Sequence, residues 1–169
     1  MIPTLQTQRL KLRPYQRRDF DAYAAFFASD QVTHMGGPID AEKAWAWFTN
    51  DIASWALYGF GTLGVEYEGQ FAGGVGLVHP PHFPEPECGW FVFDDFTGKG
   101  IAQEAGRAML DHSFATTNLP SIVSYISAAN TASIRVAEAL GGTRDPDANG
   151  PDGFNALVYR HYRKGVSHD

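Results

Sequence analysis

Cysteine is nearly absent from this sequence, which contains Cys88 and no other among its 169 residues. A disulfide within the chain needs two cysteines, and a cysteine-rich structural zinc site needs several, so both are excluded. The sequence also lacks any run of about eighteen apolar residues, and residues 1–13 lack a basic stretch followed by an apolar run. We therefore expect no membrane span, no secretory signal and a cytoplasmic location.

Positive charge is in the minority. Lysine and arginine number 13 against 19 for aspartate and glutamate, which gives a formal net charge of -6 and an isoelectric point near 5.4. Binding along a nucleic-acid backbone needs a basic face, so we expect no nucleic-acid partner. The acidic balance is compatible with cationic substrates, although net charge governs electrostatic steering rather than the identity of a ligand.

Apolar side chains are plentiful enough to build one core. They make up 44% of the residues, and aromatic ones alone make up 14%. The length suits one domain, and no internal repeat, low-complexity tract or linker divides the chain. We expect a single domain over residues 1–169.

The N-terminal third has the pattern of a strand followed by two helices. Leucines alternate with basic residues over Leu5–Pro14, which predicts a first strand. Aromatic residues at helical spacing predict a helix over 20–27 with Asp19 as its cap, and a second helix after Asp40. The second helix should bury the apolar residues Trp45, Phe48, Ile52 and Trp55.

The pattern becomes extended in the middle of the chain. Two runs, 61–67 and 70–78, are separated by Glu68-Gly69, a pair typical of a hairpin turn. Further strands are expected at 87–93, 122–126 and 154–162, and helices at 100–114 and 131–140. The hairpin must be antiparallel, whereas the strand–helix–strand unit over 87–126 favours a parallel crossover. The sequence thus predicts an α+β fold, with a mixed, mostly antiparallel sheet flanked by helices on both faces.

One segment combines a strand, the turn Gly98-Lys99-Gly100 and the start of a helix. The first turn of a helix presents unpaired N–H groups and a partial positive charge, and glycines let an anion approach them. A Walker A loop is excluded because Gly100 follows the lysine, and the dinucleotide fingerprint fails because Gln103 replaces its third glycine. On spacing alone, a pyrophosphate cradle and a plain turn before a helix both remain open.

The same segment resembles the acetyl-coenzyme A signature Gln/Arg-x-x-Gly-x-Gly/Ala of the GNAT N-acetyltransferase superfamily. Gly100 and Ala102 match its last two fixed positions, and Thr97 stands where the family has Gln or Arg. That departure removes one side-chain anchor but leaves the backbone cradle intact.

Two further segments resemble the ribosomal-protein-N-acetyltransferase-like (RimJ/RimL-type) branch of that superfamily. Residues 130–136, followed by Leu140-Gly141-Gly142, are similar to its Asn-x-x-Ser helix and closing glycine, and residues 8–14 are similar to its first strand. Together the three matches run in the right order over nearly the whole chain. The resemblance implies a GNAT-like fold.

The resemblance also implies acetyl-coenzyme A (acetyl-CoA) as co-substrate, and no metal. Its pantetheine arm would pair like an added strand with the backbone of Phe91, Val92 and Phe93, where the strand splays from its neighbour. The residues expected to hold the pyrophosphate through their N–H groups are Gly98, Lys99, Gly100, Ile101 and Ala102. Asn130 is expected to cap its helix and contact the pantetheine.

The expected reaction is direct acetyl transfer to a primary amine, on a protein N-terminus or a small molecule. Such an amine is mostly protonated at neutral pH, so a base or a water relay must deprotonate it. Glu87 is the first candidate base, with a solvated strand-end carboxylate as the alternative. His79 and His82 are candidates to relay a proton or shape the acceptor pocket. Ser133 is the candidate contact for the departing thiolate, because Ala137 stands where many family members carry tyrosine.

Other classes of function stay open at this stage. One is a catalytically silent acyl-CoA-binding sensor, and another is an enzyme acting on nucleotide phosphates. Acceptor contacts would come from residues 19–55 and 79–87, but the sequence identifies neither the amine nor whether the protein is a monomer or a homodimer. A metal cluster of the loop histidines with Glu85 and Glu87 is disfavoured by its spacing.

Overall fold

The computed structural model describes residues 1–165 of the chain. It opens with two short strands, β1 (Leu5–Gln6) and β2 (Leu10–Arg13), which pair antiparallel with Leu5 opposite Leu12. The prediction of one strand over Leu5–Pro14 is therefore wrong. The chain turns at Thr7, whose amide donates to the Leu10 carbonyl oxygen at 3.0 Å and whose hydroxyl oxygen accepts the Leu10 amide at 2.9 Å.

One eight-stranded sheet runs in the order β1-β2-β3-β4-β5-β6-β8-β7. The other strands are β3 (Thr62–Tyr67), β4 (Gln70–Val78), β5 (Glu87–Val92), β6 (Ser121–Ser127), β7 (Thr143–Arg144) and β8 (Ala156–Tyr162). All neighbouring pairs are antiparallel except β5 and β6. This confirms the predicted α+β class, and adds β7, which is too short to show a periodicity in sequence.

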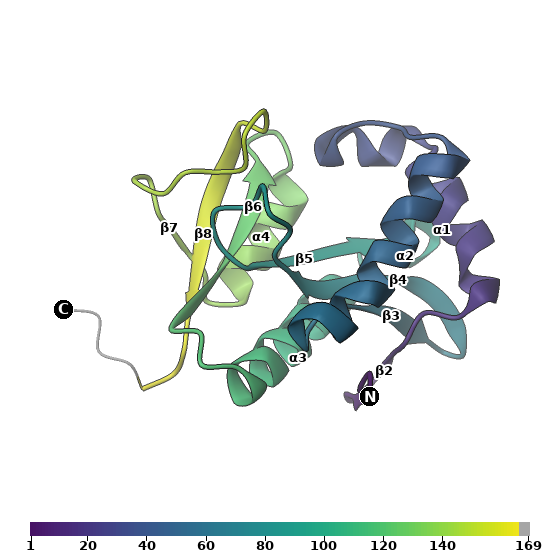
Figure 1. Ribbon diagram of the computed structural model, residues 1–169, viewed down its shortest axis with the longest axis horizontal. Coiled ribbons are helices and arrows are strands. Elements are labelled where there is room, and N and C mark those ends of the chain that lie inside the picture. Colours follow the sequence, from purple (N-terminus) through teal and green to yellow (C-terminus); the bar gives the residue numbers. More distant parts are fainter. Residues whose placement is uncertain (166–169) are drawn as a thin grey trace.

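Helices connect the strands and cover both faces of the sheet (Figure 1). They are η1 (Arg17–Asp19), α1 (Phe20–Phe27), η2 (Asp30–Met35), α2 (Ala41–Tyr58), η3 (Asp94–Phe96), α3 (Ile101–Thr116) and α4 (Thr131–Ala139), where η marks a 3-10 turn. No helix within residues 1–165 combines the length and apolarity needed to cross a bilayer.

The caps of the first two α-helices differ from each other. Asp40 caps α2 as predicted, since its Oδ1 accepts the Lys43 amide at 2.8 Å. Asp19 occupies the N-cap position of α1, as predicted, but its side chain makes no capping hydrogen bond there. Its buried carboxylate instead pairs with the Arg13 guanidinium at 2.7 Å, six residues earlier in the chain, a contact that helical periodicity does not predict.

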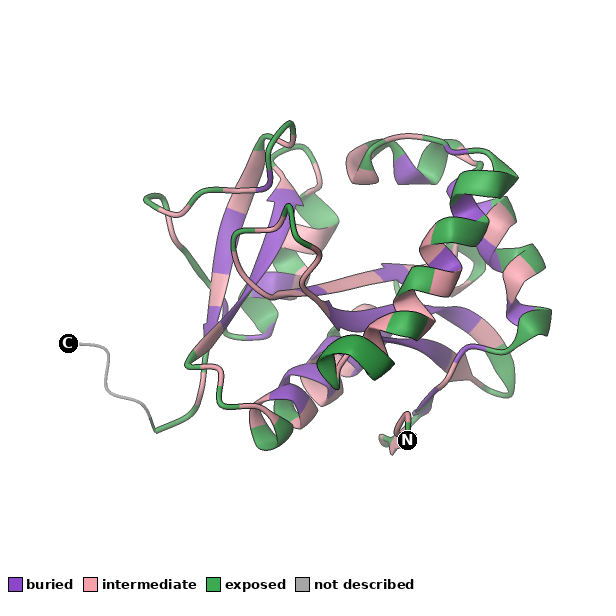
Figure 2. Ribbon diagram, viewed as in Figure 1, coloured by how far each residue is buried: buried purple, intermediate pink, exposed green. Residues whose placement is uncertain are grey.

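The two faces of the sheet bury different kinds of side chain. An aliphatic core lies under α3 and includes Leu12, Leu63, Val75, Ile101 and Met109. An aromatic core lies under α1 and α2 and includes Tyr15, Tyr23, Phe27, Phe48 and Phe91. Trp45 is 44% exposed, so its predicted burial is wrong. Along α2, exposed residues alternate with intermediate and buried ones (Figure 2).

The sheet divides between β5 and β6. These strands share one register pair, Glu87 with Val123, whereas β4 and β5 remain paired from Gly73–Val92 to Val78–Glu87. Beyond Glu87 the strands β1–β5 and β6–β8 diverge into two groups (Figure 1). The divergence leaves a V-shaped gap along one edge of β5.

Candidate active site

Side chains at the point of divergence replace hydrogen bonds that the two strands no longer make. The Ser124 hydroxyl on β6 donates to the Cys88 carbonyl oxygen on β5 at 2.7 Å. In the other direction, the Tyr125 amide donates to Oε1 of Glu87 at 3.2 Å. Glu87, the candidate base, therefore lies at the apex of the gap with its carboxylate bound to the opposite strand.

A buried histidine supports this apex from β8. Nε2 of His161 lies 3.1 Å from the Ser124 hydroxyl oxygen. Because that hydroxyl gives its one hydrogen to Cys88, Nε2 must carry the ring hydrogen and donate it. Burial, followed by the positive charge of Arg107, lowers the pKa of His161 to about 4 and keeps the ring neutral. The sequence analysis missed His161, because only its tertiary contacts identify it.

The free edge of β5 is formed by the backbone of Trp90 and Val92. The Phe93 amide donates to the Ala72 carbonyl oxygen of β4 at 2.9 Å, and alternation along a strand directs Phe91 the same way. The polar backbone groups of Trp90 and Val92 therefore point into the gap. Of the three residues expected to pair with pantetheine, Val92 faces the gap and the other two face β4.

The turn beyond β5 has glycines where the backbone is left-handed. Gly98 has φ 74° and Gly100 has φ 75°, a region that other residues seldom adopt. Helix α3 begins at Ile101, and no side chain caps it. The Thr97 hydroxyl is engaged locally, donating to the Asp94 carbonyl oxygen at 2.9 Å. The first-turn N–H groups of α3, including that of Ala102, are thus left for solvent or an anion.

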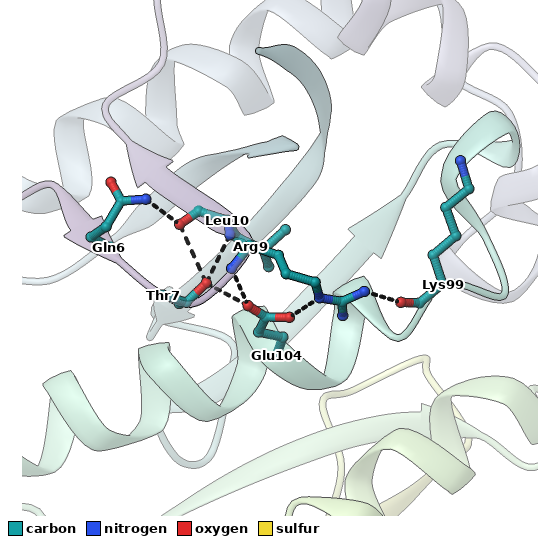
Figure 3. A network of polar contacts seen from close by, with 6 residues as sticks. All are labelled: Gln6, Thr7, Arg9, Leu10, Lys99 and Glu104. Atoms are coloured by element: carbon teal, nitrogen blue, oxygen red, sulfur yellow. Dashed lines mark hydrogen bonds and ion pairs between the residues drawn. The ribbon is translucent and has the colours of Figure 1, made fainter. Parts of the chain in front are cut away.

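A polar network ties this turn to the N-terminal hairpin (Figure 3). Arg9 donates from Nη1 to the Lys99 carbonyl oxygen at 2.9 Å and from Nε to Glu104 at 2.7 Å. The Thr7 hydroxyl donates to the other carboxylate oxygen of Glu104 at 2.6 Å. Burial would raise the pKa of Glu104, but the hydrogen bonds from Thr7 and Arg9 and the charge of Arg9 lower it. Its charge is therefore compensated, which reduces repulsion of an anion at the helix N-terminus.

Helix α4 supplies two of the expected site residues on the other side of the gap. Oδ1 of Asn130 accepts the Ser133 amide at 3.1 Å, which confirms the predicted cap. Both residues line the same cleft as Glu87. Ala137 is fully buried, and its methyl group has no proton to donate to a thiolate.

A cleft of about 960 Å³ extends from the gap to the space between α2 and the sheet. It brings together Glu87, Asn130, Ser133 and the loop histidines His79 and His82. Other residues that line it include Tyr23, Trp47, Asp51, Thr62, Gly74, Gly76, Gly89 and Phe91. The residues 98–102 do not line this cleft; they lie beyond the other end of β5, after η3.

Two carboxylates in the cleft have strongly shifted acidities. Burial raises the pKa of Glu87 to about 7, against the opposing effect of the Tyr125 amide. Burial likewise raises the pKa of Asp51 to about 7, against a hydrogen bond with the Thr62 side chain. Sequence reasoning missed Asp51, which follows no motif. Within residues 1–165, no lysine or arginine forms an ion pair with either carboxylate.

The remaining reactive groups do not suggest other chemistry. Cys88 is 1% exposed, and burial together with the charge of Glu87 raises the pKa of its thiol, so the reactive thiolate is disfavoured. In the described part of the chain, no group of three or more His, Cys, Asp or Glu side chains could hold a metal ion.

Comparison with known proteins gives a consistent result. The family model described as "Acetyltransferase (GNAT) domain" matches residues 9–143. A crystal structure of an acetyltransferase from Agrobacterium tumefaciens str. C58 is 44% identical, covers 96% of each chain and superposes with a TM-score of 0.92. The coenzyme A complex of RimL, a ribosomal L7/L12 alpha-N-protein acetyltransferase, has a TM-score of 0.75 over 95% of this chain and 98% of that one, at 16% identity. At this identity the likeness is one of fold.

A sequence relative has a more specific name. It is the "FsC-acetyl coenzyme A-N(2)-transacetylase" of Aspergillus fumigatus, 29% identical over 155 residues. The match covers 83% of this chain and 65% of that protein.

Proposed function

Since the chain belongs to the GNAT acetyltransferase family, it is an acetyltransferase that depends on acetyl-CoA, and we propose that its acceptor is a primary amine held in the cleft beside Glu87. One observation carries this proposal: the free edge of β5 runs from the Glu87 carboxylate, at the apex of the gap, toward the N-terminus of α3, which no side chain caps. The first feature suits an extended amide-bearing chain, and the second suits a pyrophosphate.

In this proposal acetyl-CoA binds along the gap. The amides of its pantetheine arm pair with the backbone of Trp90 and Val92, as an added strand would. Its pyrophosphate accepts hydrogen bonds from the N–H groups of the turn and first helical turn, residues 98–102. Ile101 is 1% exposed, so it contributes only its backbone. The thioester then lies toward the apex, within the cleft lined by Glu87, Asn130 and Ser133.

The amine nitrogen attacks the thioester carbon, and the new C–N bond forms while the C–S bond breaks. Glu87 takes the proton that the nitrogen must lose, directly or through water; a carboxylate with a pKa of about 7 is suited to that task at neutral pH. The departing thiolate receives a hydrogen bond from the Ser133 hydroxyl and a proton from solvent. The products are an N-acetylated amine and free coenzyme A.

Two relatives support nitrogen as the acceptor atom. The name of the Aspergillus protein describes transfer from acetyl coenzyme A to an N(2) position, and RimL is named for acetylation of a protein α-amino group. Neither name identifies the amine that this chain uses, and the feature that the two names share is nitrogen as the acetylated atom.

The test is release of free coenzyme A from acetyl-CoA in the presence of a panel of amines, with mass-spectrometric detection of the acetylated product. We expect turnover with at least one amine of the panel. Binding of coenzyme A by calorimetry, combined with no turnover for any amine, would instead indicate an acyl-CoA sensor. No binding of coenzyme A at all would overturn the proposed site.

A further inference from the structure

Asp51 is a partly buried carboxylate in the cleft, and no lysine or arginine among the described residues forms an ion pair with it. It lies on α2, lines the cleft, and hydrogen-bonds with the Thr62 side chain. The arginines that are buried in the described chain pair with other carboxylates, such as Asp19. Withdrawing a carboxylate from water, even in part, costs free energy, and a cation bound beside the carboxylate offsets that cost. Its position in a cleft suggests that a ligand supplies this charge.

The sheet places Asp51 at a defined distance from Glu87. Thr62 on β3 lies opposite Gly76 on β4, which lies opposite Gly89 on β5. The Glu87 carboxyl carbon would be 3.8 Å from a methyl group at Gly89, so the Glu87 carboxylate lies near Gly89, at the β5 end of this row of three residues. The two ends of this row are about two strand spacings apart, roughly 10 Å, with the Glu87 carboxylate at one end and Asp51 beside Thr62 at the other. Gly76 and Gly89 add no side chains of their own to this row, and the Thr62 hydroxyl lies over Gly76, 2.5 Å from where a methyl group there would be.

A second polar group points at the same floor without a partner. The Tyr15 hydroxyl is one of the buried polar atoms with no hydrogen-bond partner among the described residues, and Tyr15 is 8% exposed. A methyl group at Gly74, which lines the cleft, would lie 2.5 Å from that oxygen. After burial, the charge of Asp51 is the next cause that raises the pKa of both Tyr15 and Tyr23, so this carboxylate lies near the two phenols.

We propose that the acceptor carries a second positive charge, which Asp51 binds while the reacting nitrogen lies at Glu87. This rests on the proposed function, and it names the substrate class: a short diamine or an equivalent dication. Four or five methylene groups separate two nitrogens by roughly 6–7 Å. A charge-assisted hydrogen bond of about 2.8 Å at each end extends that span to roughly 12 Å, close to the separation of the carboxylates. The rings of Tyr23, Trp47 and Phe91 line the cleft and can cover the methylene groups.

The test compares 1,5-diaminopentane with pentylamine, which has the same chain and one charge fewer. We expect the wild-type protein to prefer the diamine by about tenfold or more in kcat/KM, since a charged hydrogen bond has that effect. Calorimetric titration of the coenzyme A-saturated protein with each amine measures the same preference without turnover. Asp51→Asn keeps the shape of the side chain and should reduce the preference to less than about threefold.

The matched control is Glu42→Gln, which removes the same charge from an exposed position on the same helix. It should leave the preference unchanged, which separates local binding from electrostatic steering. Equal kcat/KM values for the two amines in the wild-type protein would overturn the second-charge site and leave the proposed function standing. So would an equal loss of kcat/KM for both amines in Asp51→Asn. Absence of acetyl transfer to every amine in the panel would overturn both.

Discussion

Glu87 links the two strands at the apex of the gap and is also the proposed base. Its carboxylate accepts the Tyr125 amide at the apex of the gap, where the strands stop pairing. That hydrogen bond favours the charged form, but burial outweighs it and raises the pKa to about 7. A carboxylate in this state is oriented by the fold and can take up a proton near neutral pH.

Replacing Glu87 with glutamine should therefore affect turnover rather than cofactor binding. We expect Glu87→Gln to lower kcat by roughly 10²- to 10³-fold, because an amide cannot accept the proton. The wild-type kcat should rise as the pH increases through about 7, where Glu87 loses its proton, and the kcat of the variant should not show this rise. Measurements are kcat as a function of pH and the dissociation constant of coenzyme A, which should stay the same.

Asp51→Asn supplies the control, because Asp51 is expected to titrate in the same range. The rise of kcat with pH should persist in Asp51→Asn with pentylamine as acceptor. If Glu87→Gln retains both the wild-type kcat and its rise with pH, then a histidine of the 79–82 loop or a water relay is the base.

Asp51 also makes a prediction about stability. Its folded-state pKa of about 7 lies above that of an ordinary aspartate, so between about pH 4 and 7 the folded protein holds a proton that the unfolded chain has lost. The free energy of unfolding therefore falls as the pH rises through this window. Asp51→Asn removes the effect and should stabilise the protein by roughly 1–2 kcal/mol at pH 8, with little change near pH 4. Urea unfolding at the two pH values measures this.

The same gain in the free energy of unfolding at both pH values would contradict a desolvated carboxylate at Asp51. A gain confined to high pH would fit a residue retained for binding at the expense of stability, as is common in functional sites.

At the level of elements, local patterns were sufficient wherever local contacts decide the structure. The Glu68-Gly69 hairpin, the antiparallel strands beside it and the Asn130 cap depend on neighbours in sequence. The break between β1 and β2 depends partly on Glu104, which binds Thr7 from 97 residues away. His161 and Asp51 escaped sequence reasoning for the same reason, since their properties come from burial against distant segments.

The turn before α3 can be tested with two substitutions of nearly equal shape. Asp and Asn both tolerate the left-handed backbone of Gly100 better than other side chains do, and they differ in charge. We expect Gly100→Asp to weaken coenzyme A binding by at least about tenfold more than Gly100→Asn, because its carboxylate repels the pyrophosphate. Calorimetry at low ionic strength measures the difference. Equal affinities would show that no anion binds at this turn.

Over the whole molecule, the site lies where two halves of one sheet separate. The half with β1–β5 carries Glu87 on β5, Asp51 on α2 and the turn before α3. The half with β6–β8 carries α4 with Asn130 and Ser133 (Figure 1). The halves are joined at the apex by one register pair and by the bonds of Ser124 and Tyr125. A ligand that pairs with the open edge of β5 would therefore add a connection between the two halves.

Amide hydrogen exchange can locate that connection within a single strand. The amides of Trp90 and Val92 point into the gap and should exchange rapidly in the free protein, whereas the Phe93 amide already donates to Ala72. Saturating coenzyme A should slow exchange at Trp90 and Val92 by about tenfold or more and change Phe93 much less, which makes Phe93 an internal control. NMR resolves these amides individually. Uniform slowing across β5 would indicate general stabilisation by ligand binding, because an added strand can protect only the alternate amides that face it.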